Sequence, residues 1–256
     1  GTEEIMETKL VRIAEISAKS KHPIFTSVYH LINEDMLKQC HKELDGSKAV
    51  GIDKVTKDEY GKNLDRNIKD LVQRLKNKSF KPLPSLRVYI PKANGKKSPL
   101  GIASYENKIV QMAVKKILGA IYEPRFLNCM YGFRPNRGCH EAITEVYQRI
   151  SYGKISYIVD ADIKGFFDHI DHEWMMKFLE WNIQDKNLLW LIRKYLKAGI
   201  MEQDKFEPTE EGSAQGSVMS PMLANIYMHH VFVDAVVQTC SEEGNAGRVF
   251  SCQLCG

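Results

Sequence analysis

The sequence predicts an α+β fold that is helix-rich with small antiparallel sheets. Most of its apolar residues recur at helical spacing, and only a few short segments alternate as strands do. The 256 residues, 43% of them hydrophobic, suffice for a core in one large domain or two closely packed ones. The sequence has no run of about 18 apolar residues and no signal-peptide pattern. We therefore expect a cytoplasmic, intracellular protein without a membrane segment.

The first part of the chain is expected to be mainly helical. The opening segment has apolar residues at helical spacing, and amphipathic helices are expected over 33–44 and 57–78. Pro82 and Pro84 end the last of these helices, because proline cannot continue one.

A hairpin is expected next. Residues 86–90 alternate between apolar and polar side chains, and Asn94-Gly95 favours a tight turn with lysines at its tip. Such a basic tip would make a good lid for a triphosphate. The remaining expected elements are a helix over 104–122 capped by Ser104, a helix reaching about 151, a strand over 156–162, helices over 171–181 and 186–198, a hairpin over 200–211, and a helix that starts at Ser220-Pro221.

The strand expected over 156–162 brings two carboxylates to one face. Asp160 and Asp162 are separated by one residue, and carboxylates side by side repel each other unless a cation lies near them. Because Mg²⁺ prefers carboxylate oxygens and keeps positions open for phosphates, the pattern suits metal-dependent nucleotidyl transfer. Taken alone, the same acids would serve equally well to end a strand and make a turn soluble.

Basic residues gather in one part of the chain. The formal charge is only +4, but residues 61–100 contain eleven Lys and Arg against two Asp, which is a local charge of +9. Phosphate backbones select such a surface, although an ordinary solvated helix face explains a charge run as well. The basic residues are Lys62, Arg66, Lys69, Arg74, Lys76, Lys78, Lys81, Arg87, Lys92, Lys96 and Lys97.

Five sequence blocks resemble, in the right order, those of group II intron-encoded reverse transcriptases, also called maturases. The residues 48–53 also resemble the N-terminal extension of that family. Together they make a specific match, whereas each block alone is weak. Some other palm-type nucleotidyl transferase is disfavoured by the first three blocks. The five blocks are Pro82–Lys92, Pro99–Ile102, Tyr131–Gly138, Asp162–Phe167 and Gly212–Pro221.

The resemblance implies the fingers and palm of a right-hand polymerase. It implies RNA-directed DNA polymerase activity with Mg²⁺, and as partners group II intron RNA, an RNA template with a DNA primer, and dNTPs. The sequence does not indicate an oligomeric state. The implied regions are an N-terminal extension with a template-covering loop over 1–55, fingers over 56–155, an incomplete palm over 156–237 and an atypical tail over 238–256.

The resemblance also assigns roles at the metal and the sugar. The family has an aromatic residue five positions after its catalytic acid, and Phe167 stands there relative to Asp162, which favours Asp162 over Asp160 as the metal-binding residue. The carbonyl of Ile163 is implied as a second ligand. Phe167 is implied to exclude a 2′-hydroxyl, although a core aromatic is an equally ordinary role for phenylalanine.

Further residues are expected to contact the nucleotide and the RNA. The nucleotide would meet Lys92, Lys97, Arg87, Gln215 and Gly216, where glycine lets the backbone approach closely. The family usually has a basic residue where this chain has Ser98, and Lys97 would have to replace it. Arg134 would grip the template or pin its own loop. The residues expected to bind RNA are Lys69, Arg74, Lys76, Lys78, Lys81, Arg134 and Arg137.

The family's aromatic-Ala-Asp-Asp hairpin has no counterpart in the sequence, which contains no Asp after Asp234. With one carboxylate in place of a cluster, two-metal catalysis should be severely impaired. We expect the 256-residue chain to bind RNA and to polymerise poorly. The alternative is a non-catalytic RNA-binding module that supports intron splicing.

Overall fold

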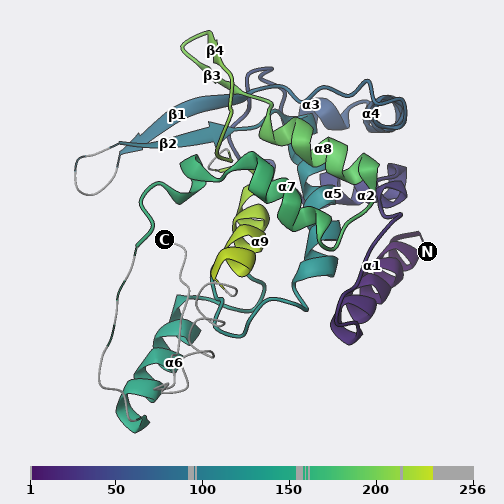
Figure 1. The fold of residues 1–256 in the computed structure, drawn as a ribbon. Coiled ribbons are helices and arrows are strands. Elements are labelled where there is room, and N and C mark those ends of the chain that lie inside the picture. Colours follow the sequence, from purple (N-terminus) through teal and green to yellow (C-terminus); the bar gives the residue numbers. More distant parts are fainter. Residues whose placement is uncertain are drawn as a thin grey trace.

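The fold has three visible parts (Figure 1): a group of packed helices, a sheet whose β1–β2 hairpin projects from that group, and helix α6, which lies apart from the other helices. No helix in the described part of the chain is long and apolar enough to cross a membrane. The computed structural model describes residues 2–91, 95, 97–153, 158, 160, 162–213 and 216–232.

Helix α5 (Tyr105–Tyr122) is the centre of the helical group. Apolar residues lie on most of its sides, and Ile109 and Ile117 are fully buried. A helix that is hydrophobic nearly all round needs neighbours on several sides. Helices α1 (Thr2–Lys19) and α2 (Glu34–Glu43) are two of them, and both lie where the sequence predicted helices.

The single helix expected over 57–78 proves to be two helices, α3 (Lys57–Gly61) and α4 (Leu64–Lys76). The expectation was wrong at Asn63, where the backbone leaves the helical conformation with φ −126° and ψ 39°. Gly61, just before the break, weakens a helix because it loses more conformational freedom than other residues. Helix α4 keeps the predicted apolar stripe, which is buried against the core.

The strands form one mixed sheet with the order β2-β1-β3-β4 in the described part of the chain. Both predicted hairpins are antiparallel, as expected. However, β1 pairs with β3 in parallel, with Ser85 opposite Ile200, so the expected separate antiparallel sheets are joined into one. The strands are β1 (Ser85–Pro91), β2 (Lys97–Ile102), β3 (Ile200–Glu202) and β4 (Lys205–Glu207).

Side-chain caps explain where two of the later helices begin. Asp171 accepts a hydrogen bond from the Trp174 N–H, and Asp185 accepts one from the Leu188 N–H. These bonds satisfy N–H groups that have no partner within the helix. The remaining elements are the 3₁₀ turns η1 (Tyr29–Leu31) and η2 (Phe166–His169) and the helices α6 (Cys139–Tyr152), α7 (His172–Glu180), α8 (Lys186–Leu196) and α9 (Ser220–Phe232).

The strand expected over 156–162 falls largely outside the described residues. Ile158, Asp160 and Asp162 are described, and they are exposed and lie in no strand. That the two aspartates share one face of a strand therefore remains a prediction.

Candidate functional site

The first contact of the site joins the β1–β2 hairpin to the loop before α9. Gly216 has a φ of +96°, and a Cβ built there would lie 2.4 Å from Leu100 Cδ1 and 3.1 Å from the Gly101 carbonyl oxygen. A side chain at Gly216 would therefore be strained in its backbone and would collide with the hairpin. The glycine thus lets two of the predicted blocks touch each other. From the sequence, we expected a close approach of the Gly216 backbone only to the nucleotide.

The second contact joins the same loop to the segment that follows Asp162. The N–H of Gly212 donates to the Ile170 carbonyl at 2.8 Å, and the N–H of Ser213 donates to the Phe167 carbonyl at 2.8 Å. A Cβ at Gly212, whose φ is +83°, would lie 2.7 Å from the Asp168 carbonyl oxygen. Three blocks that are far apart in the sequence thus meet in one place.

His172 holds this loop through a hydrogen bond, a role that sequence reasoning missed. Its buried imidazole lies with Nε2 2.6 Å from the Gly212 carbonyl oxygen. A carbonyl only accepts, so Nε2 carries the proton and donates it. No local sequence signal could have found this bond, because its two residues are forty positions apart.

Phe167 lines a pocket of about 280 Å³ between the hairpin and the loop, together with Leu100 and Gly101. The ring is half-buried and lies edge-to-face with Phe166 at 5.8 Å and with Phe133 at 6.3 Å between centroids. Phe167 thus takes part in aromatic packing and still faces the pocket, so both roles that the sequence suggested for it stay open.

Arg87 reaches the same pocket, but its guanidinium already contacts two carboxylates. Its Nη1 donates to Glu202 at 3.1 Å and to Glu207 at 3.2 Å. Hydrogen bonds from Tyr89 and then from Arg87 lower the pKa of Glu202, so that carboxylate is ionised at neutral pH. Arg87 therefore links β1 to β3 and β4, and a triphosphate would have to compete for it.

Two other expected nucleotide contacts, Lys92 and Gln215, lie outside the described residues. Lys97 is described and is exposed at the start of β2, opposite Pro91. Its ammonium group has no ion-pair partner among the residues that the structure describes, so its charge is available at the hairpin tip.

The expected metal ligands, Asp162 and Ile163, are exposed, and so is Asp160. Mg²⁺ is commonly bound by one or two carboxylates together with waters and substrate phosphates, and this donor set fits such an open site. No group of three or more His, Cys, Asp or Glu gathers within the described parts of the chain. The described donors therefore fall short of a carboxylate cluster for two metals.

Comparison with known proteins identifies the chain. Residues 90–245 match the family described as reverse transcriptase (RNA-dependent DNA polymerase). This match extends over more than half of the 256 residues. The chain belongs to the reverse transcriptase family. Members of this family act on nucleic acids and use a divalent metal ion.

Similar proteins support the expected branch of the family. The group II intron-encoded protein LtrA of Lactococcus lactis subsp. cremoris is 37% identical over 224 residues, which are 87% of this chain and 37% of LtrA. An uncharacterised 91 kDa protein in the cob intron of Schizosaccharomyces pombe is 36% identical over 204 residues, 78% of this chain and 25% of that protein. YkfC of Escherichia coli is 36% identical over 187 residues, 72% of this chain and 49% of YkfC. The chain thus spans less than half the length of these relatives, and the resemblance to group II intron reverse transcriptases is confirmed.

In this member of the reverse transcriptase family, Arg134 forms hydrogen bonds within its own loop. Its guanidinium donates to Glu123 at 2.9 Å and to the carbonyls of Leu127 and Met130 at 2.9 and 3.0 Å, and the side chain is only 7% exposed. The structure shows the loop-holding role of Arg134, and its grip on the template stays a prediction. Sequence reasoning had left both roles open.

Arg137 differs from Arg134 in its partners. It donates to the carbonyl oxygen of Asn128 at 2.6 Å and to the Asn128 side chain at 3.2 Å, and its guanidinium lies over the ring of Tyr131. These three partners are neutral, but the charge of Arg137 also helps to lower the pKa of Glu145, after the hydrogen bonds from Tyr131 and Arg149. The positive charge of Arg137 is therefore only partly available to attract phosphate.

The remaining expected RNA-binding residues lie on α4 and just after it. Lys69, Lys76, Lys78 and Lys81 are exposed. Arg74 differs, because it forms ion pairs with Asp70 at 2.7 Å and with Glu106 at 2.8 Å. Its main role in the structure is to tie α4 to α5.

The N-terminal loop is packed rather than open. Gly51 is buried, and a Cβ there would lie 2.5 Å from the Ser104 backbone nitrogen. Lys108 also donates to the Ala49 carbonyl at 2.5 Å. The loop is therefore anchored on the start of α5.

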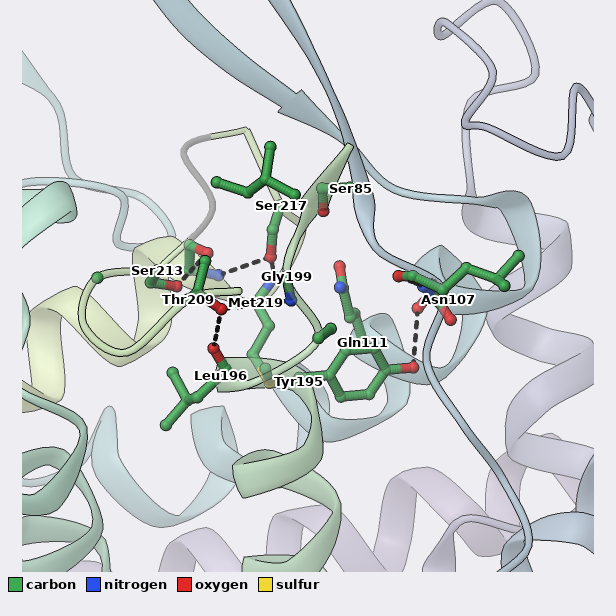
Figure 2. A pocket seen from close by; sticks show the side chains of 15 residues that line it. Ser85, Asn107, Gln111, Tyr195, Leu196, Gly199, Thr209, Ser213, Ser217 and Met219 are labelled. Atoms are coloured by element: carbon green, nitrogen blue, oxygen red, sulfur yellow. Dashed lines mark hydrogen bonds between the residues drawn. The ribbon is translucent and has the colours of Figure 1, made fainter. Parts of the chain in front are cut away.

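A small polar cavity (Figure 2) adjoins the pocket that Phe167 lines, and the two share Thr209, Gly212 and Ser213. Its volume is about 30 Å³, and Gln111, Tyr195, Ser213 and Ser217 are among the side chains that line it. This space is too small for a nucleotide and holds about two water molecules. Gln111 accepts a hydrogen bond from the Val218 N–H at 3.2 Å, so these polar residues support the loop before α9.

Proposed function

We propose that the chain is the polymerase core of a reverse transcriptase encoded in a group II intron. It binds intron RNA and an RNA template paired with a DNA primer, and it uses dNTPs to copy RNA into DNA. This proposal rests on the family match and on the intron-encoded relatives. Residues 1–55 then form the N-terminal extension, 56–155 the fingers, 156–237 an incomplete palm and 238–256 an atypical tail.

The observation that carries the proposal is the meeting of the three blocks. Gly216 contacts Leu100 of the hairpin, and the loop from Gly212 is hydrogen-bonded to the segment that contains Phe167. An incoming dNTP would lie in the pocket between them, with its sugar against Phe167 and its phosphates toward Lys97. The bulk of Phe167 would then disfavour a 2′-hydroxyl.

In this proposal the metal ion is bound by Asp162 and Ile163, the exposed first residues of the Asp162–Phe167 block. The Asp162 carboxylate and the Ile163 carbonyl would hold Mg²⁺, which when bound would neutralise charge on the transferred phosphate. Asp162 is exposed and therefore free of packing constraints. Because the sequence contains no Asp after Asp234, we expect weak polymerisation by the 256-residue chain.

A second candidate is an RNA-binding module that supports splicing without catalysis. The lysines on and after α4 favour it, since they are exposed and have no ion-pair partner among the residues that the structure describes. Arg74, in contrast, is paired with Asp70 and Glu106. The two functions are compatible within one polypeptide. They differ in what they need, because polymerisation requires carboxylates that bind the metal ions and RNA binding does not.

Primer extension on an RNA template tests the proposal, with Mg²⁺ and dNTPs, beside an RNA-binding assay on the same template. We expect binding with little extension, equal binding by Asp162→Ala, and loss of any residual extension in that variant. Asp160→Ala is the matched control and should keep the residual extension. Robust extension lost only in Asp162→Ala would overturn the expected impairment, and failure to bind RNA would overturn the proposed function.

A further inference from the structure

A basic groove forms where the segment after α4 meets α8. It has a volume of about 340 Å³, and we call it the Trp190 groove. The segments 76–81 and 186–197, which supply most of it, contain no Asp or Glu. The groove is lined by Lys81, Pro82, Trp190, Arg193, Lys194, Lys197 and Ala198.

The amphipathic pattern of α8 explains why these side chains face outward. Leu188, Leu191 and Ile192 are fully buried in the core. That arrangement leaves Arg193 and Lys194 on the opposite, exposed face. The basic stripe is thus held in place by a rigid helix.

Trp190 lies at the edge between core and groove. Its ring packs partly against the core and is half-buried, so its orientation is held. The ammonium group of Lys78 lies 5.9 Å from the ring centroid. An aromatic face that already attracts a cation offers a stacking surface beside positive charge.

The positive charge of the groove is largely uncompensated. Arg193 lies 4.0 Å from Glu173, at the limit of an ion pair. Within the described chain, Lys81, Lys194 and Lys197 have no ion-pair partner. Exposed cations around an aromatic ring are the combination that binds single-stranded nucleic acid, because phosphates meet the cations while a base stacks on the ring.

We propose that the Trp190 groove binds an unpaired segment of RNA, separately from the template and primer. One base stacks on Trp190 in place of the Lys78 ammonium group, and the neighbouring phosphates contact Lys194 and Lys197. This inference rests on the proposed RNA-binding function and adds a second site to it. An unpaired segment fits because a base inside a duplex cannot expose its face to a ring.

Binding measurements with two RNA probes test the proposal. One probe is a short unstructured RNA, and the other is an RNA template fully paired with a DNA primer. For Lys194→Ala/Lys197→Ala we expect Kd for the unstructured RNA to rise about tenfold. The slope of log K against log salt should become less steep by about 1.4, which is about 0.7 for each lost phosphate contact. Binding of the paired probe should stay within about twofold of the original chain.

The matched control is Lys177→Ala on the neighbouring helix α7. Lys177 also lies over a tryptophan, with its ammonium group 4.3 Å from the Trp174 ring centroid. The control should bind both probes like the original chain. Equal loss in the control and the groove variant, or no loss in the groove variant, would overturn the groove while leaving RNA binding intact. Failure of the original chain to bind either probe would overturn the proposed function as well.

Tryptophan fluorescence reports on stacking itself. The chain has three tryptophans, and Trp174 and Trp181 are more than half exposed. The variant Trp174→Phe/Trp181→Phe therefore leaves Trp190 as its single fluorophore. We expect the unstructured RNA to quench this signal, and unchanged fluorescence at saturating RNA would contradict stacking on Trp190.

Discussion

At the residue scale, Gly51 determines how closely the N-terminal loop lies against α5. A Cβ there would be 2.5 Å from the backbone nitrogen and 2.6 Å from the Cα of Ser104. Backbone atoms cannot rotate out of the way, so Gly51→Ala should lower the free energy of unfolding by about 2 kcal/mol. Urea unfolding would measure this change.

The control for this prediction is Gly46→Ala in the preceding part of the chain. Its Cβ would meet only the Lys57 side chain, at 3.2 Å from Cδ, and that side chain can move. We expect this variant to unfold close to the original midpoint. Equal destabilisation by the two substitutions would show that Gly51 is not specially constrained.

Single residues also show where sequence reasoning reached its limit. It could identify Arg134 as important but not choose between its own loop and the template, because the choice depends on the Leu127 and Met130 carbonyls in three dimensions. It could not find the ion pair between Arg87 and Glu202, whose residues are 115 positions apart. A side chain's type is local information, whereas its partner is set by the fold.

At the element scale, Asp185 joins α8 to the chain before α2. Its Oδ2 accepts hydrogen bonds from the Val28 and Tyr29 N–H groups, both at 2.7 Å, and its Oδ1 accepts from the Asn187 and Leu188 N–H groups. The carboxylate therefore caps one helix and satisfies a second backbone segment at once.

We expect Asp185→Ala to lower the free energy of unfolding by about 3 kcal/mol, since buried N–H groups would lose charged partners. Asp171→Ala is the matched control, because its carboxylate caps α7 at an exposed position with a hydrogen bond to Trp174. That variant should lose about 1 kcal/mol. Urea unfolding would compare them, and equal losses would contradict the bridging role of Asp185.

Elements with a clear apolar period were predictable from the sequence. Helices α5 and α8 lie where the 3.6-residue pattern indicated, because each buries one continuous set of apolar side chains. The break between α3 and α4 was missed, since the apolar stripe continues through Asn63 and only the backbone departs. The parallel pairing of β1 with β3 was also missed, because pairing between distant strands leaves little local trace.

At the scale of the whole molecule, the blocks of the sequence predicted the family and the parts of the site. They could not show that Gly212 and Gly216 are contact points, since glycine alone indicates only backbone freedom. They also could not reveal the Trp190 groove, whose two segments meet only in the folded chain. The family blocks predict which residues take part in the reaction. Surfaces that distant segments form together can be recognised only in the structure.

The central claim is that this chain recognises RNA through its phosphates. The most direct measurement is the affinity for an RNA template paired with a DNA primer at increasing salt concentration. We predict that log K falls linearly with log salt with a slope of about −1.8 or steeper, which corresponds to two or more phosphate contacts at about −0.9 each. Binding that does not change with salt, or no binding at low salt, would contradict the account.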